Sequence, residues 1–350
     1  MPLGIKKILA VRFSSIGDLV LTTPFYREVK ALFPDAELHL ITSREFAAIF
    51  AGNPHIDRLI PFDRKAGSAE LDAQAAAIEA EGYDLAFDLH RSLRSRLLLR
   101  KGLGKSGVKV HHVDKRSFKR NLLLSPLKIN LFKEASPQRL EYLKLLARYA
   151  GGRPLNGATA LFPGPQERAE VETILAELKA EGKPLVALGP SASFALKCWP
   201  KESFLALGLA LDQMGVQVVL LGGAADQEPR WISEQSGGRL VDLAGRLSFL
   251  GSAELLRWAR LAVSNDSTVV HFAEAMGTPV VAIFGPTATE FGFAPFLPQS
   301  RVMERELSCR PCSRNGKGRC INKEQLACLK GISVEQVLAA VRPLLAARNG

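Results

Sequence analysis

A polar turn separates two apolar runs in residues 260–287, and its residue types suit the binding of a phosphorylated ligand. The first run ends in Asp266, Ser267 and Thr268, helical spacing of apolar residues follows, and 279–284 predicts a second buried strand. This is the strand–helix–strand pattern of a parallel sheet, whose ligands bind at the carboxyl ends of the strands. Backbone N–H groups and the positive end of the helix dipole favour a phosphate there.

His271 would end the first turn of that helix, five residues after Asp266. A histidine beside an apolar helix face is often a structural residue with satisfied hydrogen bonds. Its position at a strand-to-helix switch favours the alternative, a role in ligand binding.

Two loops after other predicted strands carry residues of the same chemical kind. Ser191, Ser193 and Lys197 follow the run 184–188, and hydroxyls with a lysine suit a phosphate, although an ordinary loop is the alternative. Gly222 and Asp226 follow the next strand, where the glycine allows close backbone approach and the carboxylate could accept hydrogen bonds from a ribose. The spacing is not GxGxxG, so the dinucleotide fingerprint is absent.

The first predicted strand, 6–13, leads into Ser15 and Asp18 at the first strand-to-helix turn. Asp18 falls in the first turn of a helix, where the dipole stabilises a carboxylate and where acidic caps are common. Its predicted place at the carboxyl edge of a sheet makes a catalytic role the alternative to capping.

Four cysteines form the pattern C-x2-C-x7-C-x7-C near the C-terminus, at Cys309, Cys312, Cys320 and Cys328. Four thiols at such spacing suit a structural zinc ion, although a second C-x2-C pair is lacking. Disulfides and packed free thiols are the alternatives, and a structural role is favoured over catalysis in each case.

Predicted strands and helices alternate along the whole chain, which indicates an α/β protein of two doubly wound, Rossmann-like domains facing a central cleft. The glycine- and proline-containing stretch 151–154 is the expected linker. We therefore expect an N-terminal domain over 1–153, a C-terminal domain over 154–332 with the cysteine-bearing tail, and a terminal helix over 333–350 that could pack across the domain junction.

The positive charge is concentrated in the N-terminal half. The chain of 350 residues has a formal net charge of +11, and the stretch 91–153 alone holds 17 Lys/Arg against 3 Asp/Glu. Such a segment suits an anionic partner or a solvated face. No signal peptide or apolar run of about 18 residues is present, so we expect a cytoplasmic protein.

Four segments together resemble the ADP-heptose:lipopolysaccharide heptosyltransferases of glycosyltransferase family 9, over nearly the whole chain. Their order and spacing carry the resemblance, and the cysteine-bearing tail also looks like that of many members. The segments are SSIGDLVLTTP (14–24), KCWPKESF (197–204), GGAADQE (222–228) and NDSTVVHFAEAMGTPVVAIFGPT (265–287).

The resemblance implies a GT-B fold and an inverting, metal-independent transfer of heptose from ADP-heptose to the Kdo/heptose inner core of lipopolysaccharide. It implies Asp18 as general base, with the donor held by a set of C-terminal residues. These are Ser191, Ser193, Lys197, Gly222, Asp226, Asp266, Ser267, Thr268, His271 and Thr287. Members commonly have glycine where this chain has Thr268, which adds a side chain close to the expected phosphate.

The basic segment then has an expected partner, the anionic Kdo-lipid A acceptor at the cytoplasmic face of the inner membrane, where peripheral contact would follow. The predicted acceptor residues are Ser15, Arg91, Arg94, Arg96, Lys115, Arg116 and Arg120. No cofactor is required, apart from the structural zinc proposed for the tail. The nearest alternative is another nucleotide-sugar glycosyltransferase acting on a different cell-surface glycan. A nucleic-acid-binding protein is less favoured, because aromatic residues are sparse in the basic segment and no nucleic-acid-binding module is present.

Overall fold

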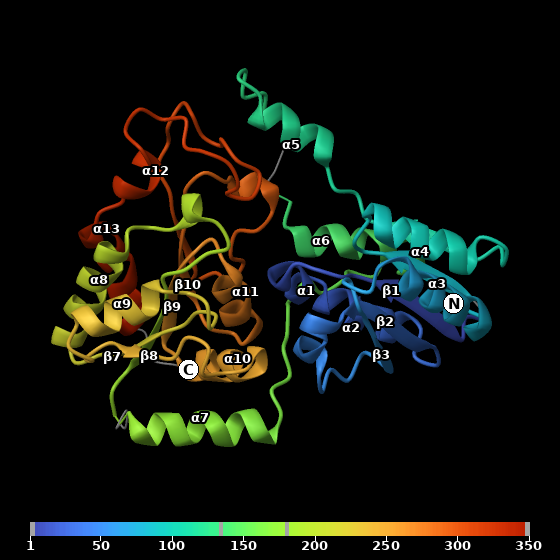
Figure 1. The fold of residues 1–350 in the computed structure, drawn as a ribbon, viewed down its shortest axis with the longest axis horizontal. Coiled ribbons are helices and arrows are strands. Elements are labelled where there is room, and N and C mark those ends of the chain that lie inside the picture. Colours follow the sequence, from blue (N-terminus) through green and yellow to red (C-terminus); the bar gives the residue numbers. More distant parts are fainter. Residues whose placement is uncertain (1–3, 133–135, 179–181, 347–350) are drawn as a thin grey trace. The chain divides into compact units, whose positions relative to one another are not determined.

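The computed structural model describes residues 4–132, 136–178 and 182–346, and it divides into two compact units (Figure 1). Unit 1 comprises Met1–Arg116 and Gln138–Phe162, and unit 2 comprises Ser117–Pro137 and Pro163–Gly350. The sequence analysis placed 117–137 in the N-terminal domain. The structure groups this segment with unit 2, since Arg120 and Lys128 donate to backbone carbonyls of that unit.

Unit 1 is built on a parallel five-stranded sheet with the order β3-β2-β1-β4-β5. Two 3₁₀ segments, Arg44–Phe50 and Lys144–Tyr149, complete it. Its strands and helices are β1 (Lys7–Val11), α1 (Ile16–Leu21), α2 (Thr23–Leu32), β2 (Glu37–Ser43), β3 (Arg58–Phe62), α3 (Gly67–Glu81), β4 (Leu85–Asp88), α4 (Leu93–Leu103), β5 (Lys109–His112) and α6 (Gln138–Leu143).

Successive side chains of a strand point to opposite faces of the sheet, and in unit 1 apolar side chains lie on both faces. Leu9 and Val11 of β1 pack with Ile78 of α3 and Leu98 of α4 on one face. On the other face the rings of Phe25 in α2 and Phe87 in β4 lie 5.0 Å apart. Helices therefore cover both faces, as expected for a doubly wound sheet.

Unit 2 contains a parallel six-stranded sheet with the order β11-β10-β9-β6-β7-β8. Short 3₁₀ turns lie at Ala195–Lys197 and Thr289–Phe291. Its elements are α5 (Ser117–Leu124), α7 (Pro165–Glu177), β6 (Leu185–Gly189), α8 (Lys201–Gln213), β7 (Gln217–Leu220), α9 (Glu228–Gln235), β8 (Val241–Asp242), α10 (Phe249–Trp258), β9 (Leu261–Asn265), α11 (Thr268–Ala275), β10 (Val280–Ile283), β11 (Arg301–Met303), α12 (Ala327–Lys330) and α13 (Val334–Ala346).

The core of unit 2 joins α8, α9, α12 and α13 to one face of its sheet. Leu207 of α8, Leu329 of α12 and Val341 of α13 pack with Val263 of β9 in one buried cluster. The other face carries α7, α10 and α11, which contact one another and β9. The described part of the terminal helix thus packs on unit 2, and its predicted role at a domain junction stays a prediction.

Both sheets have a switch point where the strand order reverses, between β1 and β4 in unit 1 and between β6 and β9 in unit 2. Open α/β sheets bind ligands at such points, outside the carboxyl ends of the strands. Asp18 follows β1, and Lys197 and Asp266 follow β6 and β9. The topology therefore places the main predicted site residues at the two switch points.

The helical segment that follows β1 is divided into α1 and α2 at Thr22. Thr22 Oγ1 donates to the Leu19 carbonyl (2.6 Å) and Thr23 Oγ1 to the Val20 carbonyl (2.8 Å). Pro24 follows in the first turn of α2, where its missing N–H is tolerated. Local side-chain hydrogen bonds and the proline therefore restart the helix.

Among the described residues, no helix is both long and apolar enough to cross a bilayer. The helix α3 has 15 residues and α13 has 13, whereas a membrane span needs about 20 predominantly apolar ones.

Candidate active site

Asp18 lies in the first turn of α1, directly beyond the carboxyl end of β1. Its Oδ1 is 2.9 Å from the Arg12 guanidinium, and its Oδ2 accepts from the Ser15 hydroxyl at 2.7 Å. The Tyr142 hydroxyl from α6 donates to Oδ1 over a longer 3.4 Å. The Asp18 side chain is 20% exposed. The carboxylate is thus oriented by neighbours while it keeps access to solvent.

Arg12 anchors this carboxylate from within the protein. Its side chain is 8% exposed, and it also donates to the Leu89 carbonyl beyond β4 and faces the Tyr142 ring. Burial lowers the pKa of Arg12, but Asp18 together with Tyr142 and Tyr26 raises it, and the net result is a pKa above its ordinary value. The sequence analysis missed Arg12, although an arginine at the buried end of a strand demands an acidic partner.

His90 lies after β4 beside this site, and the sequence analysis did not select it. Its ring packs edge-on against Phe13, and its buried Nδ1 has no hydrogen-bond partner among the described residues. Burial, with a further contribution from Arg12, lowers the pKa of His90 to about 3. The imidazole is therefore neutral at physiological pH.

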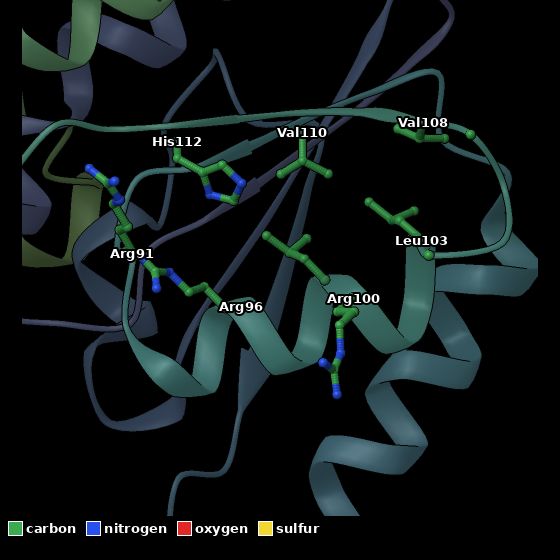
Figure 2. Close-up of a pocket in the computed structure, with 10 residues that line it drawn as sticks. Arg91, Arg96, Arg100, Leu103, Val108, Val110 and His112 are labelled. Carbon is green, nitrogen blue, oxygen red and sulfur yellow. The ribbon is translucent and has the colours of Figure 1, made fainter.

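Unit 1 holds a pocket of about 470 Å³ between α4 and the edge strand β5, which we call the basic pocket. In Figure 2 the Arg91 and Arg96 side chains lie at one end of the pocket, whereas the Arg100 side chain points away from it. Leu99, Leu103, Val108 and Val110 form an apolar lining, and His112 completes the polar end. Such a pocket suits an anionic group attached to an apolar one.

The loop between β4 and α4 is ordered by the fully buried Asp88. The carboxylate accepts from the backbone N–H of His90 (3.0 Å) and Arg91 (2.6 Å) and from the Ser95 hydroxyl (3.0 Å). Arg91 itself lies 3.6 Å from Asp114, whereas no ion pair joins Arg96 to a carboxylate in the described part of the chain. The Arg91 guanidinium is thus partly engaged, by Asp114 and by the Val113 carbonyl at 3.1 Å, whereas the Arg96 side chain is exposed.

The other predicted acceptor residues are not gathered at the basic pocket. Arg94 is half-buried on α4 and Lys115 follows β5. Arg116 is buried beside Glu141, and Arg120 of unit 2 is buried over the rings of Phe291 and Phe293. The last two arginines are thus engaged in internal contacts.

Lys197, Asp266 and Thr287 meet at the carboxyl edge of the second sheet, and we call them the second-sheet cluster. Lys197 Nζ is 2.9 Å from Asp266 Oδ2, which also accepts from Thr287 Oγ1 at 2.8 Å. The lysine side chain is 14% exposed and the aspartate 10%. A cation held in this way beside a helix start can receive a phosphate.

The start of α11 lies beside this cluster. Its N-cap residue is Ser267, which makes no side-chain cap hydrogen bond to the helix and instead lies 3.0 Å from the Ser264 hydroxyl. Thr268 opens the helix and is half-buried. The first N–H groups of α11 are thus not capped by that side chain, which suits an anion.

Asn265 is a third residue that the sequence analysis did not select. Its Oδ1 accepts from the Trp199 N–H (2.9 Å) and its Nδ2 donates to the Pro190 carbonyl (2.7 Å). It therefore ties the loop that carries Lys197 to the end of β9. An asparagine at the buried end of a strand was the available signal, because its amide requires partners.

The remaining predicted donor residues lie around the carboxyl edge in separate contacts. Ser191 donates to Glu228 (2.9 Å), Ser193 is exposed, and His271 is buried with its ring 6.4 Å from that of Phe293. The Gly223 N–H donates to Asp226 Oδ2 at 2.8 Å, which closes its loop. At Gly222 an added Cβ would lie 2.9 Å from the same oxygen, so the loop requires a glycine there.

The four tail cysteines are unpaired thiols in unit 2. Burial raises the pKa of Cys312 and of Cys328, and the Leu326 N–H lies 3.3 Å from the Cys320 sulfur. In the described ranges, no three His, Cys, Asp or Glu side chains are grouped so that they could hold a metal ion. As placed here, the thiols do not fit a metal, and the zinc site stays a prediction.

The chain matches known proteins along most of its length. Residues 73–320 match the model of glycosyltransferase family 9 (heptosyltransferase). The chain is 26% identical over 303 residues to lipopolysaccharide heptosyltransferase 2 of Salmonella typhimurium, with 81% of this chain and 84% of that protein covered. It is 25% identical over 321 residues to lipopolysaccharide heptosyltransferase 1 of Pseudomonas aeruginosa, with 87% and 86% covered.

The same fold occurs in the solved structure of the E. coli ADP-heptose LPS heptosyltransferase II, with a TM-score of 0.74, 24% identity, and 97% and 98% of the two chains covered. Two parallel-sheet α/β units of this kind define the GT-B class of glycosyltransferases, which confirms the predicted fold class. Since the family model spans most of the sequence, the chain belongs to glycosyltransferase family 9, the heptosyltransferases. It is therefore an enzyme of the glycosyltransferase class.

Proposed function

We propose that this enzyme transfers heptose from ADP-heptose to the Kdo/heptose inner core of lipopolysaccharide. The names of its relatives support this substrate pair. The observation that carries the proposal is the chemistry of the two switch points. One holds an oriented and partly exposed carboxylate, and the other holds a lysine beside the open start of a helix.

We assign Asp18 as the general base. It takes the proton of the acceptor hydroxyl while that oxygen bonds to the anomeric carbon of heptose. The bond from that carbon to the ADP oxygen breaks on the opposite face, so the configuration inverts. Arg12 contacts one carboxylate oxygen and Ser15 the other, so the orientation of the base is fixed for proton transfer.

The departing diphosphate gains negative charge, which Lys197 and the start of α11 are placed to stabilise. Asp266 holds the lysine, and Thr287 donates a hydrogen bond to Asp266. The family resemblance implies that the donor also contacts Ser191, Ser193, Asp226 and His271. Because Lys197 and the start of α11 supply positive charge, we propose that transfer requires no metal ion.

The basic pocket is our candidate site for the anionic part of the acceptor. Arg91 and Arg96 would pair with a carboxylate of Kdo or a phosphate of lipid A, and the apolar lining would meet the adjoining hydrocarbon. Arg116 and Arg120 were predicted to bind the acceptor. Because both are buried, we assign them instead to the support of neighbouring segments.

We further propose peripheral contact with an anionic membrane through residues 117–132. Its apolar side chains include Phe118, 72% exposed, and Leu127, 78% exposed, together with the exposed Lys119. Apolar and basic side chains on one exposed segment favour an anionic interface. Changing Phe118 and Leu127 to Ser should weaken binding to vesicles that contain anionic lipid, measured by flotation, and unchanged binding would contradict the contact.

The direct test incubates the purified enzyme with Kdo-lipid A acceptors and a panel of nucleotide sugars, and reads the products by mass spectrometry. We expect addition of one heptose with ADP-heptose and little product with other donors, with EDTA present or absent. Preferred transfer of another sugar would favour the alternative, a related transferase acting on another cell-surface glycan. Thr268, which replaces the usual glycine, is the residue that motivates the donor panel.

A further inference from the structure

The loop 313–318 of the cysteine-bearing tail, which we call the tail loop, lies directly against the side chain of Lys197. A Cβ added at Gly316 would lie 2.4 Å from Lys197 Cγ, 2.6 Å from Lys197 Cδ and 3.3 Å from Phe194 Cβ. Real Cβ atoms do not approach other atoms so closely. Glycine at 316 therefore lets the backbone of the tail loop press on the aliphatic stem of this lysine.

The tail loop is held in this shape by its own hydrogen bonds. Ser313 Oγ accepts from the Gly316 N–H at 3.0 Å and donates to the Lys317 carbonyl at 2.8 Å. Ser313 is buried, and Gly316 has a φ of +87°, which few L side chains adopt. The position of the loop against Lys197 is thus specified by named contacts.

The residues just before the tail loop hold the other side of the second-sheet cluster. The N–H groups of Cys312 and Ser313 both donate to the Pro286 carbonyl, at 3.0 and 3.1 Å. The Arg310 guanidinium donates to the Thr287 carbonyl at 3.1 Å and also to the Gly285 carbonyl. One continuous segment therefore contacts both the lysine and the threonine that meet at Asp266.

We propose that the segment 310–317 is a positioning element of the donor site, and that Gly316 sets the direction in which Lys197 points. This inference rests on the proposed role of Lys197 in binding the donor diphosphate. A long lysine side chain loses rotamer freedom when it binds a phosphate, and a stem already confined by the tail loop loses less on binding. The cysteine-bearing tail thereby acquires a function at the donor site that does not depend on its thiol chemistry.

The test compares Gly316→Ala with Gly318→Ala. Gly318 lies in the same loop with a φ of +117°, but no atom lies within 4 Å of its added Cβ, so it matches the backbone strain without the contact. For Gly316→Ala we expect ADP affinity to fall about tenfold and the donor KM to rise by a similar factor, with the acceptor KM unchanged. Gly318→Ala should leave all three near wild type. Equal effects of the two substitutions on donor KM would overturn the proposal.

A double-mutant cycle separates this inference from the proposed function. If Gly316 acts through Lys197, Gly316→Ala should not weaken ADP binding further in a Lys197→Met background. Additive losses would contradict the inference while leaving the role of Lys197 intact. If Lys197→Met alone left ADP affinity unchanged, the proposed role of the lysine would fail first.

Ser313→Ala provides a milder second variant, in case Gly316→Ala does not fold. It removes the hydrogen bonds that shape the tail loop and adds no atom near Lys197. We expect a rise of about threefold in the donor KM with an unchanged acceptor KM. A rise in both constants, or in neither, would count against the proposal.

Discussion

Each switch point carries an ion pair between a cation and an aspartate. The aspartate is the more exposed partner in unit 1, and the cation is slightly the more exposed partner in unit 2. In unit 1 the cation Arg12 is 8% exposed and the carboxylate of Asp18 is 20% exposed. In unit 2 the carboxylate of Asp266 is 10% exposed, accepts a second hydrogen bond from Thr287, and the cation Lys197 is 14% exposed. The first pair presents a base to solvent, whereas the second presents a positive charge.

This exchange explains how one fold, used twice, performs two tasks. A buried arginine cannot lose its charge, so it remains a fixed partner that orients the Asp18 carboxylate for proton transfer. In the second pair, the buried Asp266 accepts from both Lys197 and Thr287. The compact charge of the lysine suits a phosphate oxygen. Substitution of Arg12 or of Lys197 breaks one pair and leaves the other intact.

The largest expected effect on stability comes from Arg12→Met. Loss of the guanidinium removes the cation beside Asp18 Oδ1 and the donor to the Leu89 carbonyl. The free energy of unfolding should therefore fall by about 2–3 kcal/mol, less than for a fully buried pair because Asp18 reaches solvent. Chemical denaturation measures it, and Arg58→Met, at the exposed pair with Glu81, is the control, with an expected change of about 0.5 kcal/mol. Equal losses in the two variants would show that the Arg12 pair has no special role.

Breaking the second pair should affect donor binding more than folding. Lys197→Met should weaken ADP binding about tenfold, equivalent to about 1.4 kcal/mol, because one cation beside the diphosphate is lost. Calorimetric titration with ADP measures it. Lys183 is exposed and precedes β6, whereas Lys197 follows it, so Lys183→Met should leave the affinity for ADP unchanged. Unaltered ADP affinity in Lys197→Met would remove the lysine from the donor site.

Salt should separate the substrates of the two regions. The acceptor is proposed to meet the open arginines of the basic pocket, whereas the donor meets a more enclosed lysine, and exposed charges are screened more strongly. Raising the salt concentration from about 0.05 to 0.5 M should raise the acceptor KM several-fold and the donor KM much less. Similar increases in both constants would argue against an electrostatic acceptor site.

The smallest expected effect is a sensitivity of unit 1 to mild acid. The folded state lowers the pKa of His90 to about 3 and that of His111 to about 4, in each case mainly by burial, so the unfolded chain binds these protons more readily. Their contribution to stability is complete above the unfolded pKa of about 6.5 and is lost as the pH falls toward about 4. Unfolding of His111→Gln should depend less on pH across this window than that of the wild type. An identical pH dependence in both would exclude His111 as a source of the effect.

The local patterns of the sequence were sufficient to predict the fold class. Apolar runs ending in polar turns predicted strands in both sheets, although not the short edge strand β11, because side-chain periodicity reports which face of a segment is buried. The same patterns selected Asp18, Lys197 and Asp266, which the structure places at the two switch points. The roles given to these residues remain proposals.

Contacts between distant segments could not be predicted in this way. The segment 117–137 follows β5 in sequence, yet Arg120 donates to Phe291, which lies 171 residues further along the chain. The contact of Gly316 with Lys197 is of the same kind. Periodicity carries no record of such pairings, and the positive charge of Arg116 and Arg120 gave no sign that both are buried.

The measurement that tests the central claim most directly is the rate of heptose transfer by Asp18→Asn, determined with saturating ADP-heptose beside the affinity for ADP. The amide keeps the size of the side chain but cannot accept the proton, so we expect transfer to fall by about 10²–10⁴-fold while ADP binds as in the wild type. Asp35→Asn, at an exposed aspartate of the same unit, should transfer normally. Transfer by Asp18→Asn at the rate of the wild-type enzyme would contradict the account.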